Sequence, residues 1–235
     1  MFLTLGGSGL LFAQDITVPK KKVDVSGRAG DHFMMQLSSD RWMGAPDSIN
    51  SRKKTTSRGA NIYLMLDKPF KGNPNLSLAF GVGVGTSHLL LNKMSADISG
   101  TSSSLKFNNL DTLTRFSKYK LSTTYAEIPI ELRYYSNPQN PNKSVKAAIG
   151  IKIGTLINAH TKGKTLQDAS GKTLQEYTQK LNSKNYFNTT RLVATARFGY
   201  GCFSIFGAYN LTAVFKDKVA AKMNLLQTGI TISGL

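Results

Sequence analysis

Six charged residues lie in segments that are otherwise rich in apolar side chains, and they are the first candidates for chemistry. They are Glu127, Glu131, Arg133, Lys152, Arg191 and Arg197. A buried charge must be paired, because an unpaired one is strongly destabilising. The turn between two of these segments centres near residues 139–140, so antiparallel pairing would place Glu127 roughly opposite Lys152. We therefore expect the two glutamates to form an ion-pair network with the basic residues, either as a structural plug or as a gated path for ions or solutes.

Two histidines are candidates for acid–base chemistry beside a nucleophile. His88 follows Ser87, and His160 ends a later apolar segment. Adjacent residues of a strand point to opposite faces, so Ser87 cannot serve His88 directly, and no spacing identifies a third catalytic residue. Enzyme activity therefore stays an alternative without assigned catalytic residues. The single cysteine, Cys202, excludes an internal disulfide and Cys-rich zinc sites, and we expect neither a metal site nor a cofactor.

Strands must position these residues, because apolar side chains recur at every second position. From Leu76 to Gly85, large apolar residues alternate with serine, alanine and glycine, whereas a helix would scatter them around its circumference. The glycines of this stretch, at 81, 83 and 85, would leave space opposite long side chains. The same alternation predicts eight strands, near residues 31–39, 59–68, 75–91, 119–135, 144–159, 187–200, 202–215 and 223–234. The one short helix that we expect lies within residues 165–181.

Long and short connections alternate between these strands. The short ones lie at residues 69–74, 136–143 and 199–201; the long ones lie at residues 40–57, 92–118 and 160–185, with 216–222 intermediate. This alternation is typical of an all-β, eight-stranded, antiparallel up-and-down transmembrane β-barrel with short periplasmic turns and long external loops. A spanning strand needs about 9–11 residues, which the predicted strands supply. A soluble lipid-binding barrel would show the same alternation with its apolar face inward.

The N-terminal residues favour export. Residues 1–12 carry no charge, Ala13 offers a small residue for cleavage, and the stretch is too short to span a bilayer as a helix. This stretch lacks the positively charged n-region of a signal peptide, and we attribute that to a start codon placed too late. We predict a signal peptide over residues 1–13, a periplasmic segment over 14–30 and an outer-membrane barrel over 31–235.

The net charge of +17, from 30 basic and 13 acidic residues, first suggests a nucleic-acid-binding protein. The candidate external loops, at residues 40–58, 92–120, 161–185 and 216–222, hold 18 basic and 7 acidic residues, a net +11. Charges spread over several loops form no single stripe, so we do not expect nucleic-acid binding. Basic loops would instead meet the anionic headgroups of lipopolysaccharide, or serve only as a solvated surface. The basic loop residues that we single out are Arg52, Lys53, Lys54, Lys118, Lys162 and Lys164.

Three stretches of the chain resemble the PorT-like outer-membrane β-barrel family of Bacteroidota. They are Leu-Phe-Ala-Gln at residues 11–14, the alternation over 76–85, and Tyr-Ala-Glu-Ile-Pro-Ile-Glu-Leu at 125–132. The resemblance covers most of the mature chain and carries no catalytic signature. It implies an eight-stranded outer-membrane barrel, and some members of the family belong to the type IX secretion apparatus.

Together these features predict a monomeric barrel in the outer membrane, with a charge-plugged lumen and a structural or interaction role through its basic external loops. The expected partners are outer-membrane lipid and lipopolysaccharide, and envelope or secretion proteins are further candidates. A lipid-A-modifying barrel enzyme, with His88 and His160 near the external rim, is the first alternative, and a narrow ion or solute pore is the second.

Overall fold

The computed structural model describes residues 32–54 and 57–234. The predicted signal peptide and periplasmic segment, residues 1–30, lie outside the described residues.

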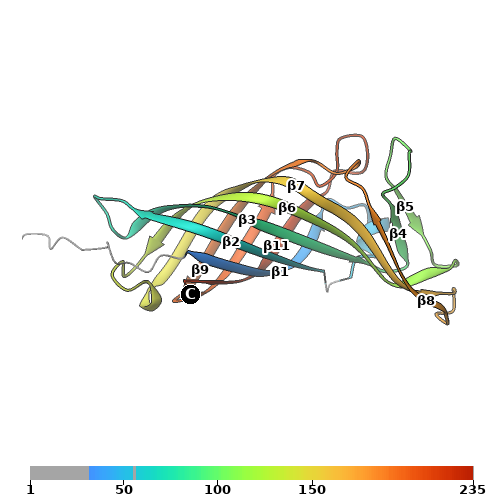
Figure 1. Ribbon diagram of the computed structural model, residues 1–235, viewed down its shortest axis with the longest axis horizontal. Coiled ribbons are helices and arrows are strands. Elements are labelled where there is room, and N and C mark those ends of the chain that lie inside the picture. Colours follow the sequence, from blue (N-terminus) through green and yellow to red (C-terminus); the bar gives the residue numbers. More distant parts are fainter. Residues whose placement is uncertain (1–31, 55–56, 235) are drawn as a thin grey trace, which may run out of the picture.

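Eight antiparallel strands pair side by side in a closed ring (Figure 1). The ring runs β1–β2–β3–β6–β7–β9–β10–β11, and pairing of β11 with β1 completes it. Its members are β1 (Phe33–Met43), β2 (Arg58–Pro69), β3 (Leu76–Leu91), β6 (Arg115–Tyr135), β7 (Val145–Gln167), β9 (Thr190–Tyr200), β10 (Phe203–Asn210) and β11 (Asn224–Ser233). The eight-stranded up-and-down barrel predicted from the alternation is confirmed. No helix within the described ranges is long and apolar enough to cross a membrane.

The remaining short elements lie almost entirely at one end of the barrel, which we call the loop end. There the helix α1 (Asp47–Asn50) follows β1, the hairpin of β4 (Met94–Asp97) and β5 (Lys106–Asn109) follows β3, and β8 (Thr173–Asn182) follows β7. Figure 1 shows β4, β5 and β8 together at this end, opposite the short turns that join β2 to β3 and β6 to β7. The turn between β6 and β7 contains a 3₁₀ helix, Pro141–Lys143.

The helix expected within residues 165–181 is absent, and that prediction was wrong. Most of this segment is a β-hairpin in which β7 continues to Gln167 and β8 pairs back on it. The ladder between β7 and β9 stops at Thr155, so the edge of β7 beyond that point is free to pair with β8. Backbone hydrogen bonding to a neighbouring strand therefore overrides a weak helical pattern.

The two faces of the strands differ in polarity, with apolar side chains outward and charged side chains inward. Leu64, Ile149 and Ile205 are 62%, 64% and 67% exposed, whereas Glu131 and Lys152 are buried. A soluble lipid-binding barrel would have the reverse arrangement. An outward apolar surface around a closed ring is stable only against lipid, because the ring leaves no unpaired backbone edge in the hydrocarbon.

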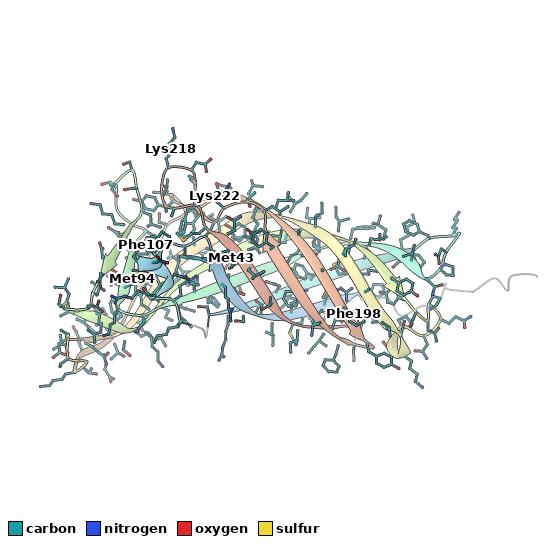
Figure 2. The ribbon with its side chains drawn as sticks, turned by 180° about the vertical axis from the view of Figure 1, so that it is seen from behind. Met43, Met94, Phe107, Phe198, Lys218 and Lys222 are labelled. Carbon is teal, nitrogen blue, oxygen red and sulfur yellow. The ribbon has the colours of Figure 1, made fainter. Side chains whose placement is uncertain are left out.

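An apolar cluster packs at the loop end of the barrel. Its centre is a group of aromatic rings, in which Trp42 lies edge-on to Phe215, with 5.4 Å between ring centroids, and Phe107 packs against both. Figure 2 shows Phe107 and Met94, both from the β4–β5 hairpin, close together at this end, and Phe198 near the opposite end. The hydroxyl of Tyr186 donates to the carbonyl of Gly100 at 2.6 Å, which ties two of the connections together. The connections thus fold into a packed cap.

Placing a charge in the outward apolar face should destabilise the barrel. Ile151 lies midway along the apolar face of β7, between Val145 and Ile157. We expect Ile151→Arg to lower the free energy of unfolding in lipid vesicles by about 2–4 kcal/mol, measured by denaturant titration. The matched control is Gln175→Arg on the exposed strand β8, opposite Leu166, which should change it by less than about 0.5 kcal/mol. Equal effects at the two positions would contradict the lipid-facing assignment.

Candidate functional site

Glu127, on β6, is the centre of a buried ion-pair group in the middle of the lumen. Its carboxylate accepts a hydrogen bond from Nε of Arg191 at 2.7 Å and pairs with Nη2 of the same side chain. Nζ of Lys152 lies 3.8 Å from Oε2 of Glu127, and the Tyr63 hydroxyl donates to that oxygen at 2.5 Å. Lys152 in turn donates to the Tyr63 hydroxyl at 3.0 Å, and the Arg191 guanidinium lies 4.1 Å from the ring centroid of Tyr125.

The register between β6 and β7 differs by two residues from the one expected. Glu127 pairs with Gly154, and Lys152 pairs with Pro129. The turn is centred at residues 140–141, one residue later than expected. The 3₁₀ helix at Pro141–Lys143 lengthens the C-terminal side of the turn. Lys152 nevertheless reaches Glu127 diagonally, since diagonal neighbours on one face of a sheet are within reach of long side chains.

Glu131, four residues after Glu127 on β6, is the centre of a second ion-pair group. Nε of Arg133 donates to Oε2 of Glu131 at 2.9 Å, and Nη2 of Arg197 donates to the same oxygen at 3.1 Å. Arg133 also lies 4.0 Å from Oδ1 of Asp67. The six charged residues singled out from the sequence are therefore all inward, buried and in contact, in one group around Glu127 and another around Glu131.

Glycines shape the space around the first group. A Cβ on Gly85 would lie 2.6 Å from Oε2 of Glu127 and 2.7 Å from Nη2 of Arg191, so only glycine leaves room there. Gly81 and Gly83 serve a different purpose from the one expected, because they lie against Met65 and Tyr63 of β2 rather than against the charged side chains.

Sequence reasoning missed other polar members of the lumen. Asp40, which was counted in an external loop, is buried inside β1 and accepts hydrogen bonds from Ser38 at 2.5 Å and from Gln227 at 3.1 Å. Tyr63 was also missed. Its position in the sequence could have identified it. Tyr63 lies between Ile62 and Leu64, which point outward, so the alternation along the strand places Tyr63 inward.

Little space remains between the ion pairs and the apolar cap. A cavity of about 10 Å³ lies there, lined by Arg191, Tyr125, Trp42 and their neighbours. That volume is about the minimum needed for a single water molecule. The arrangement holds buried charges in place beside this cavity.

The six basic loop residues lie in three different settings. Arg52 forms a bidentate ion pair with Asp111, and Lys53 donates to the backbone carbonyl of Trp42 at 2.6 Å, so both stabilise the cap. Lys54 is half-buried in the connection after α1. The other three, Lys118, Lys162 and Lys164, lie on the outward face of β6 and β7 where these strands approach the loop end.

The histidine at position 88 has a hydroxyl partner, but from another strand. Nδ1 of His88 lies 2.8 Å from Oγ of Ser122, which is fully buried, and Ser122 pairs with His160 in the ladder. No carboxylate within the described ranges hydrogen-bonds to either histidine. Nor do three or more His, Cys, Asp or Glu side chains gather as a metal-binding group in residues 32–54 and 57–234.

The closed ring, with its apolar exterior and charged interior, agrees with the result of a comparison with known protein families. A family model described as an outer membrane protein β-barrel domain matches residues 12–216 of the chain. The chain belongs to this family. No curated protein shows significant similarity to it. The outer-membrane barrel therefore faces lipid with its apolar surface, and its ion-pair groups lie at membrane depth.

Removing the Glu127 charge should destabilise the outer-membrane barrel strongly. Glu127→Gln leaves Arg191 and Lys152 buried without their carboxylate, so we expect a loss of about 3–5 kcal/mol in the free energy of unfolding in vesicles. Glu176→Gln makes the same chemical change on the exposed strand β8 and should have almost no effect. Adding Lys152→Met to the first variant should recover part of the loss. Equal stability of the two single variants would contradict the pairing.

The contact between Arg52 and Asp111 should depend on pH. The hydrogen bonds from Arg52 lower the pKa of Asp111 from 3.8 to about 2. Because the folded pKa is depressed, the contact contributes fully above pH 3.8 and is lost as the pH falls through about 2. Carboxyl carbon shifts of Asp111, followed by NMR in micelles, should give this low pKa in the parent protein and a higher pKa in Arg52→Gln. An ordinary pKa in the parent protein would show that the pair does not form.

Proposed function

We propose that the protein is a closed outer-membrane barrel whose role is structural or interactive and is carried by its loop end, which faces outward from the cell. The proposal is supported by two ion-pair groups inside the barrel and a packed apolar cap at the loop end, which together would block the lumen. A barrel that transports nothing can act only through its surfaces. The periplasmic turns are short, so the loop end provides most of the surface outside the membrane.

Charge supports contact between this end and anionic groups of the outer leaflet. Residues 40–58, 92–120, 161–185 and 216–222 form the connections at this end together with the adjoining strand ends. They carry 18 basic and 7 acidic residues, and one of the acidic residues, Asp40, is buried in the lumen. Some of these charges are used within the cap, as with Arg52, but others point away from it, and Figure 2 shows Lys218 extending from the connection between β10 and β11. Such charges attract phosphates and acidic sugars of lipopolysaccharide, or acidic surfaces of envelope proteins.

The finer assignment to the PorT-like family of Bacteroidota is part of this proposal. It rests on the sequence patterns at residues 11–14, 76–85 and 125–132. Under it, proteins of the envelope or of a secretion apparatus become the first macromolecular partners to look for, and the protein itself would act as a monomer.

Lipid A modification has weaker support. The hydrogen bond between His88 and Ser122 is the observation in its favour. However, a nucleophile must reach its substrate, and Ser122 is fully buried. A histidine base is also usually oriented by an acid, and neither His88 nor His160 contacts one within the described residues. We therefore propose a non-catalytic role.

Conductance in planar bilayers tests the closed lumen. We expect the purified barrel to insert without producing stable unitary currents, because the ion pairs and the cap both block the lumen. A large-pore outer-membrane porin serves as the positive control for the bilayer. Insertion should be verified in parallel by the heat-dependent shift of the folded barrel on gel electrophoresis. Reproducible single-channel steps from the folded protein would overturn the proposal in favour of a pore.

A further inference from the structure

Five lysines gather on the outward face of the sheet near the loop end. In the ladder between β6 and β7, Lys118 pairs with Lys164 and Lys120 with Lys162, and in the ladder between β7 and β8, Lys162 pairs with Lys180. Directly paired residues of a sheet point to the same side. We call these residues the lysine cluster. Figure 1 shows that β6, β7 and β8 run together toward this end.

The lysine cluster lies just above the apolar band that faces lipid. The outward face of β6 is apolar from Tyr134 to Ala126. An apolar band about 25 Å tall takes up about ten residues of a strand tilted by about 40°. Counted from Tyr134, the band ends near Thr124, and a polar row that includes Ser122 follows. Lys120 comes next along the same face of β6. It therefore lies at the depth of the lipid headgroups.

The charges of the lysine cluster are not neutralised by the protein. No carboxylate forms an ion pair with any of the five lysines within the described part of the chain. Glu176 is the nearest acidic residue along β8, but it lies beyond Thr178 and makes no such contact. Like charges placed directly opposite each other destabilise a sheet. Two lysine pairs in adjacent rows therefore cost folding energy unless an anion binds between them.

A groove of about 170 Å³ runs between these side chains. It is lined by Leu90, Tyr119 and four of the lysines, Lys118, Lys120, Lys162 and Lys164. Its lining is mostly apolar, from Leu90 and the aliphatic stems of the lysines, and it forms an apolar floor beside a group of four positive charges. A phosphorylated glycolipid matches this arrangement, because its phosphates suit the ammonium groups and the adjoining sugar and acyl carbons suit the floor.

We infer that the lysine cluster is a binding site for the phosphate groups of lipid A in the outer leaflet. This inference rests on the proposed outward orientation of the loop end. It goes further than that proposal, because it assigns binding to one face of β6, β7 and β8 and not to the loop charge as a whole. Lys120 and Lys162 lie at the centre of the site, and Lys118, Lys164 and Lys180 surround them.

The test compares two variants that lose the same charge at different places. The site variant is Lys118→Gln, Lys120→Gln, Lys162→Gln and Lys164→Gln. The control variant is Lys106→Gln, Lys172→Gln, Lys184→Gln and Lys218→Gln, which lie elsewhere at the loop end. The full-length barrels, folded in detergent micelles, are titrated with diphosphoryl lipid A and with dephosphorylated lipid A, and bound lipid is counted by native mass spectrometry.

We expect the site variant to bind diphosphoryl lipid A at least about tenfold more weakly than the parent protein, and the control variant less than about threefold more weakly. Dephosphorylated lipid A should bind all three proteins equally. Inorganic phosphate at the same concentration as the lipid should not displace it, because the apolar floor contributes to binding.

The outcomes separate the inference from the proposed function. Equal losses in both variants would overturn the site and leave a general role of the loop charge in place. No loss in either variant would contradict both. Displacement by inorganic phosphate would show a simple anion site in place of a lipid site. If the fourfold variant does not fold, the pair Lys120→Gln and Lys162→Gln tests the same point, and without lipid its unfolding midpoint should rise because repulsion is removed.

Discussion

The pairing of β1 with β11 closes the sheet, and the other features of the molecule depend on that closure. In hydrocarbon, no water is present to satisfy an open strand edge, so an open sheet could not span the membrane. Closing eight strands leaves a lumen that only side chains can fill. The extended parts of β6 and β7 rise beyond the ring, where β8 pairs with β7 and the β4–β5 hairpin packs into the apolar cap.

The narrow lumen determines what the interior can contain. Charged side chains inside the lumen are not solvated by bulk water. Each buried carboxylate must therefore form ion pairs or hydrogen bonds with several neighbouring side chains. Glu127 contacts Arg191, Lys152 and Tyr63, and Gly85 provides the space that these groups require. The apolar cap above them is a second closure with a different physical basis. Under the proposed function, interaction with lipid or with other proteins takes place at the outer surface and the loop end.

Alternation along the sequence predicted the strands and the inward charges, because a period of two is a property of each strand alone. Register is not local: the position of Glu127 relative to Lys152 depended on the 3₁₀ helix at Pro141, which composition does not reveal. Pro129 also lacks an N–H, and the ladder between β3 and β6 is interrupted beside it, between the pairs Phe80–Ile130 and Gly83–Glu127. The roles of Arg52 and Lys53 in the cap were unpredictable, since their partners come from distant connections or strands.

Spin-label accessibility along β10 gives the sharpest test of a sealed lumen inside a lipid-facing wall. Single cysteines at residues 204–209, in a Cys202→Ser background, would carry the label in lipid vesicles. Ser204, Phe206 and Ala208 point inward, and Ile205, Gly207 and Tyr209 point outward. Outward labels should collide with dissolved oxygen, and inward labels should be protected from both oxygen and a water-soluble nickel reagent. Collision of the inward labels with the nickel reagent would mean a water-filled lumen and would contradict a sealed one.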